Sequence, residues 1–202
     1  MNKLYYSLIA FLFFFVANAQ IINIPDAYFK SRLLEASPNN IIASTQTPDA
    51  NGNVKSYNII DTNGDGEIQV SEAILIKYLN VSLSNIENLE GIKGFTNLQY
   101  LNCGTNRLLN LNVSELTNLR YLICGANQLK SLNISGLTNL QYLSCGYNQL
   151  TNLDLSELSN LQNLYCLNNQ LSNLNVAGLS NLLYLVCSEN QLKSLNISGL
   201  TN

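Results

Sequence analysis

The stretch TNLQYLNCGTNRLLNLNVSEL, residues 96–116, decides the fold because the chain repeats it at a fixed interval. Further copies of the same frame begin at Thr117, Thr138, Ser159 and Ser180, each 21 residues after the one before. Leucines recur at the same places in every copy, together with one cysteine and one asparagine. A strict period of this length predicts an elongated stack, because a single unit so short cannot bury its own apolar side.

The order of residues inside the frame indicates how each unit folds. Leu101 and Cys103 alternate with polar or small neighbours, which is the two-residue period of a strand with one buried face. A second alternation, at Leu111 and Val113, recurs in each copy. The first alternation predicts parallel strands that pair from unit to unit, and the second predicts an opposite wall that closes the core.

The frame shared by the five copies is L-x-x-L-x-C-x-x-N-x-L-x-x-L-x-L-x-x-L, which resembles the leucine-rich repeat family, and the resemblance covers the chain from Ile76 to the end. The resemblance implies a leucine-rich repeat solenoid of 21-residue repeats, with parallel β-strands on its concave face and a small helical N-terminal cap. Together with the secretory features described below, it also resembles the internalin-type surface proteins of bacteria. That likeness implies a secreted or cell-surface protein that binds another macromolecule.

One asparagine and one cysteine hold fixed positions in every copy. The asparagine stands where the chain turns away from the predicted strand, and its amide can both accept from and donate to backbone groups left inside the coil. This is similar to the asparagine ladder of the family. The cysteine faces inward, where a thiol behaves as a small apolar group, so free buried thiols are favoured over strained disulfides or a metal site. The residues are Asn106, Asn127, Asn148, Asn169 and Asn190, and Cys103, Cys124, Cys145, Cys166 and Cys187.

Residues 1–19 are typical of a secretory signal peptide. They combine Lys3, a short apolar run, and small residues at Ala17 and Ala19 ahead of Gln20. The apolar run is too short for a comfortable membrane span, and no later segment replaces it. We therefore expect a secreted chain with no membrane span after cleavage.

The rest of the chain divides into three predicted parts. Residues 20–75 form an N-terminal cap, residues 76–97 a first irregular repeat, and residues 98–202 the regular repeats, which we expect to be truncated at the C-terminus. Within the cap, residues 24–36 predict a helix and residues 47–58 read as turns. Ser71 is expected to cap a further helical turn that leads into the first coil.

The stretch DTNGDGEIQVSE, residues 61–72, fits the calcium-loop template D-x-[DN]-x-[DN]-G-x₅-E. Calcium takes six to eight hard oxygen ligands, and this spacing wraps such groups around one point. The predicted cofactor is a single structural Ca²⁺ in an EF-hand or dockerin type of loop. The alternative is a polar turn with solvated acids. The predicted ligands are Asp61, Asn63, Asp65, Glu67 through its carbonyl, Gln69 and Glu72.

Aromatic residues recur on the outward side of the predicted concave strands, where they favour a surface for a protein or glycan ligand. The alternative is that the rings only pack across strands. These residues are Tyr78, Tyr100, Tyr121, Tyr142, Tyr165 and Tyr184.

Composition narrows the function classes. The net charge of −3 gives no basic footprint for nucleic acid. The absence of histidine from the sequence excludes Ser–His and Cys–His catalysis, so we expect a binding or adhesion module rather than an enzyme. Two alternatives stay open, namely a recognition or spacer arm of a larger secreted enzyme or anchored surface protein, and a purely structural stalk.

Overall fold

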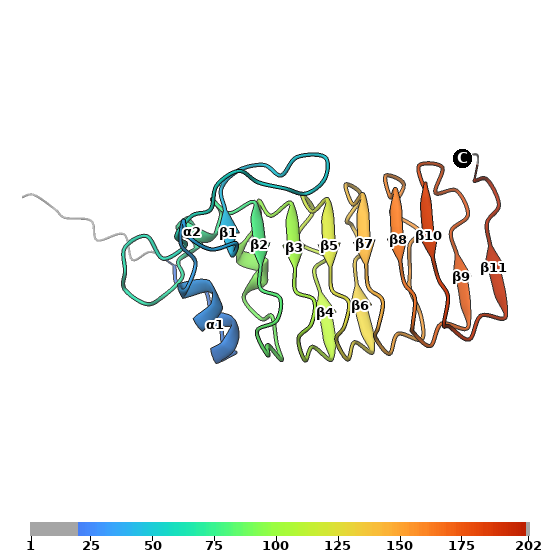
Figure 1. The fold of residues 1–202 in the computed structure, drawn as a ribbon, viewed down its shortest axis with the longest axis horizontal. Coiled ribbons are helices and arrows are strands. Elements are labelled where there is room, and N and C mark those ends of the chain that lie inside the picture. Colours follow the sequence, from blue (N-terminus) through green and yellow to red (C-terminus); the bar gives the residue numbers. More distant parts are fainter. Residues whose placement is uncertain (1–19, 201–202) are drawn as a thin grey trace, which may run out of the picture.

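The computed structural model describes residues 20–200, so the predicted signal peptide lies outside the described residues. The chain forms an elongated solenoid whose coils follow one another from an N-terminal cap to the C-terminal end (Figure 1). Most leucines of the coils point inward, and the resulting core runs from Ile24 to Leu182 as one continuous cluster. No helix within residues 20–200 is long and apolar enough to cross a membrane.

One face of the solenoid is a seven-stranded sheet. Its strands pair in parallel and in the same register from coil to coil, so that Leu101 lies beside Leu79 on one side and Leu122 on the other. The first strand is the exception, because it belongs to the cap and pairs antiparallel. In order, the sheet contains β1 (Ala43–Ser44), β2 (Tyr78–Asn80), β3 (Tyr100–Asn102), β5 (Tyr121–Ile123), β7 (Tyr142–Ser144), β8 (Asn163–Tyr165) and β10 (Tyr184–Val186).

The predicted opposite wall is present as two short sheets. One pairs β4 (Asn110–Asn112) with β6 (Ser131–Asn133), and the other pairs β9 (Asn173–Asn175) with β11 (Ser194–Asn196), both in parallel. The coil between them has no strand at residues 152–154, so this wall is interrupted where the concave sheet is continuous.

The ladder asparagines make the hydrogen bonds that the sequence predicts. Asn127 donates from Nδ2 to the carbonyls of Cys124 in its own coil and Cys103 in the coil before, both at 3.1 Å. Its Oδ1 accepts from the backbone N–H of Leu108 at 3.0 Å. The other four repeat the donor pattern one coil at a time, which satisfies polar groups that burial would otherwise leave unpaired.

The residue ahead of each ladder asparagine adopts a left-handed backbone, although none of the five is glycine. Their φ angles lie between 52° and 56°. This left-handed backbone conformation destabilises a residue that has a Cβ by roughly 1–2 kcal/mol. The ladder bonds hold this tight turn in place in every coil. The five residues are Thr105, Ala126, Tyr147, Asn168 and Glu189.

A second row of asparagines was not anticipated from the sequence, although its 21-residue period is visible there. Each donates from Nδ2 to a backbone carbonyl of the preceding coil, as Asn118 does to Thr96 at 3.0 Å. The row therefore ties neighbouring coils together at a second corner. It consists of Asn97, Asn118, Asn139, Asn160 and Asn181.

The cysteines are free thiols, as predicted. Four are buried and Cys187, in the last coil, is half-buried. Burial raises the pKa of Cys103 and of Cys166 to about 12, so these thiols stay protonated and inert at physiological pH.

The cap covers the first coil with two short helices. Helix α1 (Ala27–Leu34) begins at Asp26, whose Oδ1 accepts from the N–H of Phe29 at 2.9 Å, and buries Phe29 and Leu33. Helix α2 (Val70–Ala73) begins at Gln69 and not at the predicted Ser71. The reason is a capping box, in which Glu72 turns back to accept from the N–H of Gln69 at 3.0 Å. A single 3₁₀ turn, η1 (Ile92–Gly94), completes the first coil.

Candidate functional site

The tyrosines of the concave sheet form one nearly continuous row. Tyr78 and Tyr100 stack face to face with ring centroids 4.4 Å apart. Tyr121 and Tyr142 follow at centroid distances of 6.0 and 6.3 Å, and Tyr165 lies 5.4 Å from Tyr142. These spacings suit aromatic pairs, so each ring supports the next. The row begins at the cap and runs toward the C-terminal coils.

A loop from the cap lies over the first part of this row. Residues 45–58 leave β1 and reach over the concave sheet, above β3 and β5 (Figure 1). The hydroxyl of Tyr121 donates to the carbonyl of Ala50 at 2.6 Å. Pro48 and Gly52 are buried, and a Cβ added at Gly52 would lie 3.0 Å from the ring of Tyr100. The segment that the sequence presents as turns is therefore a docked covering loop.

The tip of the covering loop is held by its own acid. One carboxylate oxygen of Asp49 accepts from the backbone N–H groups of Asn51 at 2.8 Å and Asn53 at 2.9 Å. The hydrogen bond from Asn53, and then that from Asn51, lowers the pKa of Asp49 below its ordinary value. Gly52 completes the turn with a φ of +81°, a conformation that glycine adopts without strain.

The covering loop divides the predicted surface. Tyr78 and Tyr121 are each only 7% exposed, so each offers little surface to a ligand. Tyr100, Tyr142 and Tyr165 are half-buried, and Tyr184 is 60% exposed. Burial raises the pKa of Tyr78, Tyr100, Tyr121 and Tyr142 above that of a free tyrosine. The row is thus a packing element near the cap and an accessible surface away from it.

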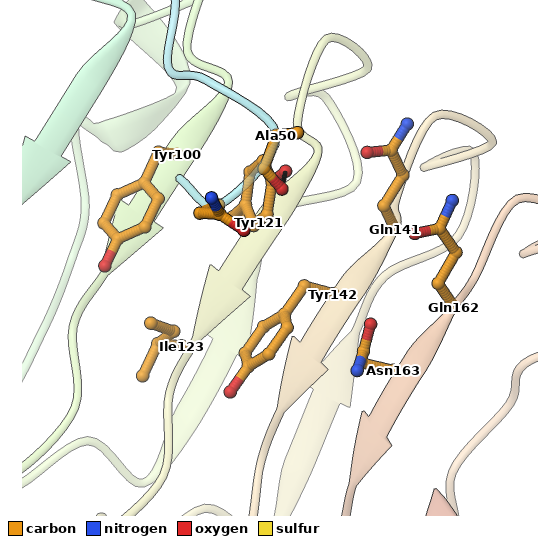
Figure 2. Close-up of a pocket in the computed structure, with 9 residues that line it drawn as sticks. Ala50, Tyr100, Tyr121, Ile123, Gln141, Tyr142, Gln162 and Asn163 are labelled. Atoms are coloured by element: carbon orange, nitrogen blue, oxygen red, sulfur yellow. Dashed lines mark hydrogen bonds between the residues drawn. The ribbon is translucent and has the colours of Figure 1, made fainter. Parts of the chain in front are cut away.

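A cavity of about 320 Å³ lies where the covered part of the row meets the open part. The tip of the covering loop forms one wall, and Figure 2 shows the Tyr142 ring between Tyr100 on one side and the amides of Gln141, Gln162 and Asn163 on the other. None of its lining residues is charged. The cavity is lined by Ala50, Asn51, Tyr100, Tyr121, Ile123, Gln141, Tyr142, Gln162 and Asn163.

Most of this lining was not singled out by sequence reasoning. Gln141 and Gln162 stand directly before the strand residues of their coils, where they share one frame position with Gln99 and Arg120. From that repetition, a row of amide side chains beside the tyrosines could have been predicted. Ala50 and Asn51 had no such signal, because the loop that carries them is not part of the repeat.

A second, shallower groove of about 390 Å³ continues along the same face. Its floor is the glycine column Gly104, Gly125 and Gly146, and Tyr142 and Tyr165 stand beside it. A Cβ at Gly125 would lie 3.0 Å from the carbonyl oxygen of Gly146, so a side chain there would crowd the neighbouring coil.

The predicted calcium loop folds around its own backbone. The carboxylate of Asp61 accepts from the N–H of Gly64 at 2.8 Å and of Gly66 at 3.0 Å. Asp65 accepts from the N–H of Glu67 at 2.8 Å, which is the main reason that its pKa is lowered. The side chain of Glu67, whose carbonyl is the predicted ligand, pairs with Lys30 of helix α1 at 2.7 Å.

The other predicted ligands lie at the far end of the loop. Glu72 is buried and accepts from the N–H and the hydroxyl of Thr62, at 2.7 and 2.9 Å. The amides of Asn63 and Gln69 donate to the same oxygen of Asp65, at 2.9 and 2.8 Å. The loop therefore brings its last residue, Glu72, against Thr62, which follows the first residue of the loop.

In this arrangement, however, the charged groups do not converge. Within residues 20–200, no three acidic, cysteine or histidine side chains come close enough together to hold a metal ion. The donor types and their order fit Ca²⁺, since all are oxygens from carboxylates, amides or a carbonyl. Their carboxylates instead accept hydrogen bonds from the loop's own amides.

Comparison with known proteins agrees with the repeat architecture. The family model described as "Leucine Rich repeats (2 copies)" matches residues 117–158 and again residues 138–180. The functional domain of InlJ from Listeria monocytogenes, described as including a cysteine ladder, matches with a TM-score of 0.69 and 28% identity. The fold is a leucine-rich repeat solenoid. The predicted fold class is therefore confirmed.

Two of the solved structures to which this solenoid is similar are internalins. The match to InlJ covers 88% of this chain and 35% of that domain. The internalin InlF from L. monocytogenes strain 4b F2365 matches with a TM-score of 0.68 and 23% identity, over 88% of this chain and 48% of that one. This chain thus spans between a third and a half of either protein. No curated protein matches the sequence.

Proposed function

We propose that this protein is a secreted or cell-surface binding module that holds a macromolecular ligand on the open part of its concave sheet. The observation that carries the proposal is the set of tyrosines beyond the covering loop, where Tyr142 and Tyr165 are half-buried and Tyr184 is exposed. Aromatic side chains with an apolar body and a polar tip are the residues that most often anchor protein interfaces. The internalin-like fold supports the same role.

The binding surface needs no catalytic group. Its tyrosines have raised pKa values where a shift is present, and its cysteines are buried in the core. A ligand held there gains contact area from rings already fixed by their neighbours, so little side-chain order is lost on binding. The expected activity is adhesion or recognition rather than turnover.

The proposal is tested with a panel of immobilised extracellular proteins and polysaccharides. We expect the protein to bind a member of the panel, and Tyr184→Ser to weaken that binding about tenfold. The matched control is Tyr28→Ser, which removes an equally exposed tyrosine from helix α1, away from the sheet. Equal binding by the two variants contradicts a role for the concave sheet.

We also propose that the loop of residues 61–72 takes up one Ca²⁺ and stiffens the cap. Support comes from the donor order and from the short distance between Thr62 and Glu72, which closes the loop end to end. Extracellular calcium sites of this type bind with dissociation constants of about 10⁻⁴–10⁻³ M. Ten millimolar Ca²⁺ then stabilises the fold by about 1.4–2.7 kcal/mol.

A calcium titration followed by thermal unfolding tests this part. The unfolding midpoint of the wild type should rise at millimolar Ca²⁺, and that of Glu115→Gln, an exposed acid of the repeats, should rise equally. Glu72→Gln should lose the calcium-dependent rise, whatever its midpoint without calcium, because Glu72 also caps α2. A rise of the same size in Glu72→Gln sinks the calcium proposal.

A further inference from the structure

The cavity beside the covering loop has a chemistry that the proposed function alone does not specify. Its floor and one side are aromatic or aliphatic, from Tyr100, Tyr121, Tyr142 and Ile123. Its other side is made of primary amides. A charged ligand would find no opposite charge among the nine lining residues.

Two charged groups next to lining residues of the cavity are already engaged in hydrogen bonds. Arg120 donates from Nη2 to the Oε1 of Gln141 at 3.2 Å, and the carboxylate of Asp49 accepts from the backbone of the covering loop. The bond from Arg120 occupies the oxygen end of Gln141 and turns its NH₂ group into the donor available to a ligand. Asn163 and Gln162, on the next coil, each bring both a donor and an acceptor.

We propose that this cavity binds the end of a neutral oligosaccharide. A pyranose ring has one face of C–H groups, which packs on the electron-rich face of a tyrosine, and a rim of hydroxyl pairs, which amides bind by donating and accepting together. The cavity offers both side by side, with the rings of the tyrosine row next to the amides of Gln141, Gln162 and Asn163 (Figure 2). This inference rests on the proposed function, because it names the ligand class of the same concave face.

The covering loop explains why the end of a chain is bound. Ala50 and Asn51 close the cavity on the cap side, and the hydrogen bond from Tyr121 to Ala50 fixes that wall. Away from the loop, the face continues into the groove with the glycine floor, which is open. A volume of about 320 Å³ falls at the lower end of the range for small-molecule sites, so the cavity holds a terminal unit while the remainder follows the groove.

A set of two matched variants tests the site. Gln162→Leu removes an amide from the cavity, and Gln170→Leu makes the same change in the same coil at an exposed position outside it. Both residues are exposed, so neither change should disturb the fold. The probe is an array of immobilised neutral and acidic oligosaccharides.

We expect the wild type and Gln170→Leu to bind neutral oligosaccharides equally, and Gln162→Leu to bind them about tenfold more weakly, as loss of the hydrogen bonds of one amide implies. Equal binding by all three proteins, or retention of acidic oligosaccharides alone, overturns the proposal. So does a wild type that retains no neutral oligosaccharide. If such a protein still binds a polypeptide in a manner that depends on Tyr184, the proposed function survives and this inference fails.

Discussion

Tyr121 and Tyr184 hold the same repeat position on the concave sheet, but their surroundings differ. Tyr121 lies beneath the covering loop at 7% exposure, whereas Tyr184 is open to solvent at 60%. Nothing in the repeat itself separates them. Tyr121 contacts a cap segment about seventy residues earlier in the sequence, whereas Tyr184 lies on β10, the edge strand of the sheet, beside Asn163. A repeated position therefore fixes where a side chain points, but not what covers it.

The largest effect should come from removing a covered ring. Tyr121→Ala deletes a buried ring that packs between Tyr100 and Tyr142 and ties down the loop, and we expect a loss of about 3 kcal/mol in the free energy of unfolding. Tyr184→Ala should cost less than about 0.5 kcal/mol, because its ring is exposed. Denaturant unfolding of both variants measures the contrast, and equal losses would mean that the row is not divided.

A smaller effect should follow from crowding the contact between loop and row. Gly52→Ala places a Cβ 3.0 Å from the Tyr100 ring and also strains a backbone with a φ of +81°. Gly178→Ala is the matched control, since it has nearly the same φ, +76°, with nothing within 4 Å of the added atom. The control should lose about 1 kcal/mol from strain alone.

Gly52→Ala should lose more than Gly178→Ala, and the excess should appear as faster amide hydrogen exchange in residues 49–53. If the two variants lose equal stability and exchange equally in the loop, Gly52 does not rest on the row.

A change of one atom isolates the hydrogen bond that pins the loop. Tyr121→Phe keeps the ring and removes the donor to the carbonyl of Ala50. The free energy of opening the loop should therefore fall by about 1 kcal/mol, while the free energy of global unfolding changes little. Tyr165→Phe removes a hydroxyl from the open part of the row. Hydrogen exchange in the loop should rise in the first variant alone, and a rise in both would contradict the assignment.

The smallest effect concerns pH. The pKa of Asp49 is lowered in the folded protein, so the bonds from Asn51 and Asn53 contribute fully above the unfolded value of 3.8 and are lost as pH falls below it. Loop exchange, corrected for the intrinsic rate, should therefore rise in acid in the wild type. Asp49→Asn keeps a neutral acceptor oxygen at every pH and removes the titration, so the acid response should disappear in this variant, and an unchanged acid response would assign the effect to another group.

The regular part of the fold could be predicted because repetition removes ambiguity. The residues equivalent to Leu101, Cys103 and Asn106 have the same surroundings in every coil. A structural interpretation of one copy therefore has to hold for all five. Burial of the thiols and the ladder bonds followed from that constraint. The asparagine row that includes Asn118 has the same period and was equally open to prediction.

The site depended on features without a period. Pro48 and Gly52 look like ordinary turn residues, and only the burial of both and the closeness of Gly52 to Tyr100 and Tyr121 show where the loop goes. Glu72 was similarly ambiguous, because one carboxylate suits both a metal ligand and a capping box. The local sequence indicates which roles such residues can have, whereas the tertiary contacts decide which of these roles each residue has.

The division of the row is tested most directly by chemical nitration of tyrosine, with mass spectrometry to locate each modified ring. The structure predicts rapid modification of Tyr184 and of Tyr28, which is 58% exposed, and protection of Tyr78 and Tyr121 until the protein unfolds. Burial and the raised pKa of the two covered phenols both act in this direction. Nitration of Tyr121 in the folded protein at the rate of Tyr184 would contradict the covering loop and the binding site built against it.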